Sequence, residues 1–116
     1  AYHFLEDMSL ETQELLVVIV LDTRNNIICR ETIYRGSLNS SLIRIGELFK
    51  PAIIRNGASI VVAHNHPSGD PSPSPEDVAV TKMIVEAGKL LEIQVHDHIV
   101  IGAERFVSLK ERGLAF

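Results

Sequence analysis

Two histidines separated by one residue stand where an apolar segment gives way to a proline-rich loop (residues 65–75). His64 and His66 follow a strand-like run, and in extended backbone residues two apart face the same side, so both imidazoles can reach one ion. Asp77 lies eleven residues after His66, in the first turn of an expected helix. Two histidines and one carboxylate can bind zinc with one coordination position left open, which is typical of catalytic zinc sites.

Other side chains compete for roles at this site. Asp70 offers a rival carboxylate, spaced from the histidine pair as in cupin-like metal motifs, but its Gly-Asp-Pro context is more typical of a turn. His96 and His98 form a second pair, which we interpret as the polar face of a strand. Asp97, between them, is a candidate to accept a hydrogen bond from a ligand imidazole.

The segments around these residues predict a mixed α/β domain. Apolar residues recur at the spacing of a helix face from Leu42 to Ile53, with Pro51 expected to kink or split that helix. The chain has no internal repeat or linker, so residues 1–116 are predicted to form one domain around a central sheet. The expected strands, of which the first two form a hairpin, are residues 15–21, 27–34, 59–63, 93–101 and 106–109.

The helix that carries Asp77 has a strong start signal. Ser74 suits the N-cap, Pro75 suits the first helical position, and two acidic residues follow in the first turn. This capping role accounts for Ser74 without any catalytic one. The helix is predicted to run toward Leu91 with one apolar stripe, made of Val80, Ile84, Ala87 and Leu91.

Composition argues against several classes of protein. A net charge of −4, a pI near 5.7 and 5% aromatic residues argue against a nucleic-acid-binding surface. Because Cys29 is the single cysteine, the chain cannot form an intramolecular disulfide or a cysteine-based zinc knuckle, and it lacks the cysteine pair of a zinc nucleobase deaminase. A single cysteine also favours a reducing, cytoplasmic setting. No apolar run reaches the length of a membrane span, and no signal peptide is recognisable.

The spacing of the candidate ligands resembles a known motif. His64-x-His66, seven residues to Ser74 and two more to Asp77 resembles the JAMM motif of JAB/MPN-type zinc metalloproteases. The contiguous His-Asn-His letters do not match an HNH nuclease, whose three residues are spread along a ββα unit. The RadC branch of the JAB/MPN superfamily is similar in three strings, at residues 64–74, 97–102 and 106–109.

The resemblance, which extends from about Leu10 to Phe116, implies a fold and an activity. The fold is a central mixed β-sheet flanked by helices. One zinc ion per chain would be bound by His64, His66 and Asp77, and the activity would be hydrolysis of peptide or isopeptide bonds in a peptide or protein substrate. No direct binding to nucleic acid or to a membrane is expected.

The resemblance also implies catalytic residues. Family members use an upstream glutamate to take a proton from the attacking water, and the matching position is Glu14, which abuts the first apolar strand. Glu11 is its competitor, because spacing alone does not separate the two. In the family, the serine at the position of Ser74 helps to hold the oxyanion of the tetrahedral intermediate.

Two other functions remain open. The superfamily includes scaffolds without turnover, so the chain is alternatively a metal-containing binding module. The family's historical association with DNA repair gives a third hypothesis, a nuclease or an accessory domain of DNA repair. RadC-like proteins usually carry an N-terminal helix-hairpin-helix region, which these 116 residues do not contain. The chain begins with Ala1 rather than methionine, as expected of a fragment of a longer protein or of a processed start.

Overall fold

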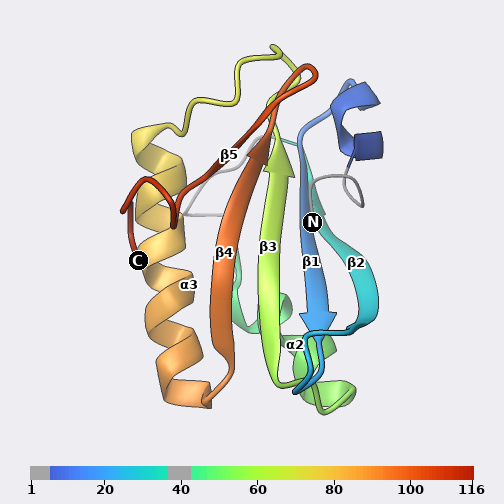
Figure 1. Ribbon diagram of the computed structural model, residues 1–116, viewed down its shortest axis with the longest axis vertical. Coiled ribbons are helices and arrows are strands. Elements are labelled where there is room, and N and C mark those ends of the chain that lie inside the picture. Colours follow the sequence, from blue (N-terminus) through green and yellow to red (C-terminus); the bar gives the residue numbers. More distant parts are fainter. Residues whose placement is uncertain (1–5, 37–42) are drawn as a thin grey trace.

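Five strands form one mixed sheet in the structure, a computed structural model that describes residues 6–36 and 43–116 (Figure 1). The sheet confirms the predicted mixed α/β class, and its strand order is β2-β1-β3-β4-β5. Only β3 and β4 are parallel, and α3 connects them. In chain order the elements are η1 (Glu6–Leu10), β1 (Leu15–Leu21), β2 (Ile27–Arg35), α2 (Ile45–Ile54), β3 (Ser59–Asn65), α3 (Pro75–Leu91), β4 (Gln94–Ile101) and β5 (Phe106–Ser108).

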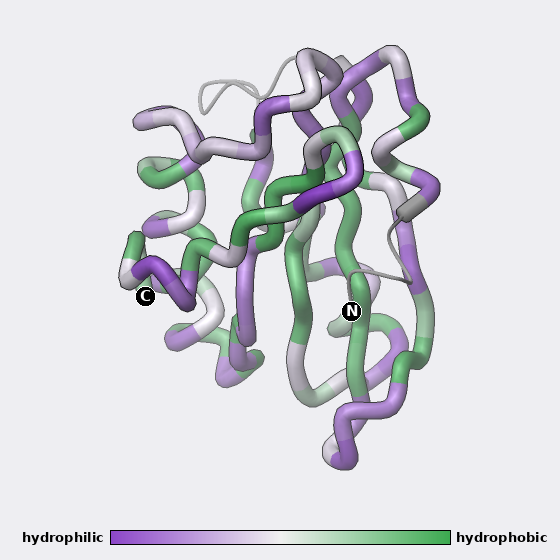
Figure 2. Tube along the Cα trace, turned by 45° about the horizontal axis from the view of Figure 1, so that its top comes forward, coloured by the Kyte–Doolittle hydropathy of each residue, from purple (hydrophilic) through white to green (hydrophobic). Residues whose placement is uncertain are grey.

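The central strand β1 is apolar throughout because both of its faces are buried. One face carries Leu16 and Val18, which pack with Phe49 of α2 and Ile84 of α3. The opposite face packs with Met8 of the short helix η1. Figure 2 shows the resulting pattern, in which the central strands are hydrophobic along their length. Apolar surface buried on two sides is the main stabilising contribution to such a strand.

Helix α2 is not split at its proline, although a split is one of the two outcomes predicted. The helix is uninterrupted from Ile45 to Ile54 although Pro51 lies inside it. The proline removes one intrahelical hydrogen bond. Pro51 itself is buried, as are Leu48, Phe49 and Ala52, so packing on the sheet holds the helix together. Leu42, where the apolar periodicity begins, lies outside the described residues.

Helix α3 begins as predicted, with Ser74 as N-cap and Pro75 as the first helical residue. Its predicted apolar stripe is wrong at the far end, because Leu91 is 46% exposed. The chain reverses direction after Leu91, with Glu92 in the left-handed region, and Ile93 occupies the buried position instead. Gly88 is required on the buried face, since a Cβ there would lie 2.6 Å from the Ile93 carbonyl oxygen. In residues 6–36 and 43–116, no helix combines the length and hydropathy of a membrane span.

Candidate metal centre

Four titratable side chains converge at the end of β3. His64 and His66 come from the end of that strand, and Asp77 comes from the first turn of α3. Glu14 precedes β1 and reaches the same face of the sheet, because Leu16, two residues later, pairs with His64 across the two strands. One ligand atom from each of these four residues lies within 4.8 Å of every other, so the cluster could hold a metal ion.

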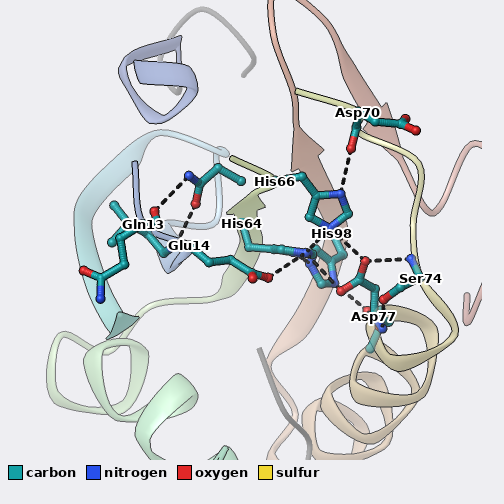
Figure 3. A network of polar contacts seen from close by, with 11 residues as sticks. Gln13, Glu14, His64, His66, Asp70, Ser74, Asp77 and His98 are labelled. Carbon is teal, nitrogen blue, oxygen red and sulfur yellow. Dashed lines mark hydrogen bonds and ion pairs between the residues drawn. The ribbon is translucent and has the colours of Figure 1, made fainter. Parts of the chain in front are cut away.

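The ligand atoms are spaced as a zinc-sized ion requires. Oδ1 of Asp77 lies 3.0 Å from Nε2 of His64, and Oδ2 of Asp77 lies 3.1 Å from Nε2 of His66. The two nitrogens are 3.1 Å apart. Tetrahedral zinc with bonds of about 2.0–2.1 Å separates its ligand atoms by about 3.3 Å. Glu14 lies farther out, with Oε1 3.9 Å from Nε2 of His64 (Figure 3).

His66 is oriented by the proline-rich loop. Its Nδ1 donates to the backbone carbonyl of Asp70 at 2.8 Å, which leaves the Nε2 lone pair facing the cluster. The hydrogen bond with Asp77 raises the pKa of His66 above its ordinary value, burial opposes this shift, and the Asp70 carbonyl supports it. The Asp70 carboxylate accepts from the backbone of Ser72 and lies outside the cluster. Asp70 therefore contributes its main chain and not the rival side-chain ligand.

Asp77 combines a structural and an electrostatic role. Its backbone N–H donates to Ser74 Oγ at 3.0 Å, and its Oδ2 accepts from the backbone N–H of Ser74 at 2.8 Å, forming a capping box. Burial raises the pKa of Asp77, but hydrogen bonds with His64 and His66 outweigh burial and hold the pKa well below its ordinary value. The side chain thus offers an ionised carboxylate to the cluster although the residue is only 2% exposed.

Ser74 lies beside the cluster as the N-cap of α3. Capping uses the oxygen as an acceptor, and a hydroxyl that accepts retains its proton for donation. The serine can therefore cap the helix and donate to a substrate oxygen at the same time. Its catalytic role stays a prediction.

Of the two candidate glutamates, the structure brings Glu14 into the cluster, whereas Glu11 is exposed and outside it.

Asn65, the residue between the two histidines, holds the backbone on both sides of Glu14. Its Oδ1 accepts from Leu15 N at 2.6 Å, and its Nδ2 donates to the Gln13 carbonyl at 3.1 Å. Sequence reasoning missed Asn65, although a polar residue at the buried end of an apolar strand is an available signal.

The interpretation of the second histidine pair is wrong for His98. This side chain is fully buried, and its Nε2 lies 2.6 Å from Nδ1 of His64. The cause is an irregularity in the β3–β4 pairing, where Ile60 pairs with Val95 but Val61 pairs with Asp97. The extra residue, His96, shifts the alternation, so that His98 faces the helices. Burial lowers the pKa of His98 well below its ordinary value, which favours the neutral ring.

Asp97 does not accept from a ligand imidazole. It accepts instead from the backbone N–H of His98 at 2.7 Å and from Ser108 Oγ at 2.6 Å. A third bond comes from the backbone N–H of Lys110 at 3.2 Å. These bonds attach β5 and the segment after it to β4, so the role of Asp97 is structural.

Comparison with known proteins identifies the family. A family model described as RadC-like JAB domain matches residues 1–114. A UPF0758 protein of Roseiflexus castenholzii is 61% identical over 110 residues, which cover 95% of this chain and 47% of that protein. Relatives in Chloroflexus aurantiacus (54% over 112 residues; 97% and 49% covered) and Geobacillus kaustophilus (49% over 113 residues; 97% and 50% covered) bear the same UPF0758 name. This chain spans about half the length of these curated relatives. It belongs to the family of RadC-like JAB domains.

Proposed function

We propose that this domain is a zinc-dependent hydrolase that cleaves peptide or isopeptide bonds in a peptide or protein substrate. The observation that carries the proposal is the convergence of three side chains. The Nε2 atoms of His64 and His66 are 3.1 Å apart, each lies 3.0–3.1 Å from one oxygen of the Asp77 carboxylate, and the more exposed Glu14 carboxylate lies beside them. Membership of the JAB family supports the same chemistry.

His64, His66 and Asp77 would hold the zinc ion. Two imidazole nitrogens and one carboxylate oxygen form a donor set that zinc favours, and three protein ligands leave a position for water or substrate. When bound, zinc would supply a Lewis acid that polarises a carbonyl group and lowers the pKa of a water molecule.

Glu14 is suited to move the proton. Its carboxylate lies 3.9 Å from Nε2 of His64, farther than either oxygen of Asp77 lies from its histidine partner. The Glu14 side chain is 21% exposed, so water can reach it. In the proposed mechanism Glu14 accepts the proton of the attacking water and returns it to the leaving amine. Ser74 donates its hydroxyl proton in a hydrogen bond to the oxyanion of the tetrahedral intermediate.

The test is hydrolysis of peptide and isopeptide libraries by zinc-loaded protein, with products identified by mass spectrometry. The matched control is Asp77→Asn, which retains the size of the side chain but removes its charge. We expect cleavage by the wild type, loss of cleavage on chelation and in Asp77→Asn, and recovery of the wild type with added zinc. Equal cleavage by Asp77→Asn would contradict the proposal. Zinc binding without turnover on any substrate would favour a binding module instead.

A further inference from the structure

A buried chain of hydrogen bonds runs behind His64, away from the cluster. Nδ1 of His64 lies 2.6 Å from Nε2 of His98, and Nδ1 of His98 lies 2.5 Å from Oγ1 of Thr81. Oγ1 of Thr81 in turn lies 2.6 Å from the backbone carbonyl oxygen of Asp77. His64, His98 and Thr81 are all fully buried, so water does not compete for these bonds. Figure 3 shows His98 directly against His64.

The direction of each bond follows from the last acceptor in the chain. A carbonyl oxygen can only accept, so the Thr81 hydroxyl donates to Asp77. That hydroxyl has one proton, and it must therefore accept from the neighbouring ring. Nδ1 of His98 carries the proton of that bond.

The remaining nitrogen of His98 then acts as an acceptor. A second proton would place a positive charge on a fully buried ring whose two nitrogens face a hydroxyl and another imidazole. Burying a charge without an anionic partner is costly. Nε2 of His98 thus accepts from Nδ1–H of His64.

We propose that Thr81 and His98 are positioning residues that keep the proton of His64 on Nδ1 and so direct its Nε2 lone pair toward His66 and Asp77. The inference rests on the proposed function, in which that lone pair binds zinc. Thr81 is the decisive residue. An imidazole can act as donor or acceptor toward His64. The Thr81 hydroxyl gives its one proton to the Asp77 carbonyl, so it can only accept from His98, and this fixes the role of His98. His66 needs no such device, since a backbone carbonyl sets its tautomer directly.

The experiment compares wild type with Thr81→Val, Thr81→Ser and Thr32→Val. Valine retains the branched shape of Thr81 without the hydroxyl, serine restores the hydroxyl, and Thr32 is an exposed control on β2. Ring ¹⁵N chemical shifts of the metal-free proteins report which nitrogen of His98 is protonated. Competition with a chromophoric chelator reports the affinity for zinc.

We expect His98 protonated on Nδ1 in the wild type, Thr81→Ser and Thr32→Val. In Thr81→Val the proton should shift toward Nε2, and the affinity for zinc should fall about 10–100-fold, the usual effect of losing a partner of a metal-bound histidine. A wild-type His98 protonated on Nε2 would overturn the proposal even if no variant folds. Wild-type zinc affinity in folded Thr81→Val would also overturn it. If the wild type binds no zinc, the proposed function is contradicted, and the proposal fails with it, whatever the tautomer of His98.

Discussion

Replacing Asn65 with alanine should destabilise the domain through two lost hydrogen bonds. The amide side chain is 1% exposed and bonds the backbone of Leu15 and Gln13. A buried N–H left without a partner, as Leu15 N–H would be, costs about 1–3 kcal/mol. Gln13 is exposed, so its carbonyl can turn to water, and that bond adds only about 0.5–1.5 kcal/mol. The expected loss is about 1.5–4.5 kcal/mol, or about 6–18 °C in Tm for a chain of this length.

The assay is urea unfolding of metal-free protein, followed by circular dichroism. Gln13→Ala is the matched control, because it removes an exposed side chain and retains the backbone carbonyl that Asn65 contacts. Its unfolding free energy should stay within about 0.5 kcal/mol of the wild type. If Asn65→Ala unfolds in urea with the midpoint and slope of the wild type, the inference that these two hydrogen bonds hold the backbone on both sides of Glu14 is wrong.

Three further predictions concern the base, the protons and the loop at the site. Glu14→Gln should retain zinc but lose about 10²–10⁴ in hydrolysis rate, whereas Glu11→Gln should lose little; initial rates of the zinc-loaded proteins check this. Because the folded-state pKa of His66 is raised, its contribution to the stability of metal-free protein is fully present below about pH 6.5 and lost as pH rises through the raised value. Zinc affinity should change in the opposite sense and fall at low pH, because protons compete with zinc for Nε2 of His66. Urea unfolding and zinc titration, both measured across the pH range in which His66 titrates, test the two expected directions. Gly102→Ala would place a Cβ 2.4 Å from a carbonyl oxygen of the proline-rich loop. It should therefore lower the free energy of unfolding in urea by about 1–3 kcal/mol and weaken zinc binding. The control Gly46→Ala meets no atom within 4 Å and should be tolerated.

The elements that sequence reasoning placed correctly are those specified by neighbouring residues. Ser74, Pro75 and Asp77 form a helix start within four residues, and the same residues place a carboxylate beside the histidines. The strand before His64 is equally local, since its apolar run ends where the ligands begin. The cluster of His64, His66, Asp77 and Glu14 was predictable for this reason, aided by a specific motif.

What sequence reasoning missed depends on contacts between distant segments. His98 reaches His64 only because His96 is an extra residue in the pairing of β4, and nothing in the letters His-Asp-His shows which residue is extra. Asn65 bonds backbone 50 and 52 residues away, a partnership that no local pattern encodes. Pro51 does not split α2, because the packing of its buried neighbours outweighs one missing hydrogen bond.

The central claim is that His64, His66 and Asp77 together bind a metal ion, and zinc stoichiometry tests it most directly. Protein loaded with zinc, dialysed and measured by elemental analysis should contain about one zinc per chain, as expected for a three-ligand site. His66→Ala should retain almost no zinc, because the two remaining ligands hold the ion poorly. Circular dichroism should show that this variant is folded. A wild type without zinc, or a His66→Ala protein with the wild-type stoichiometry, would contradict the account.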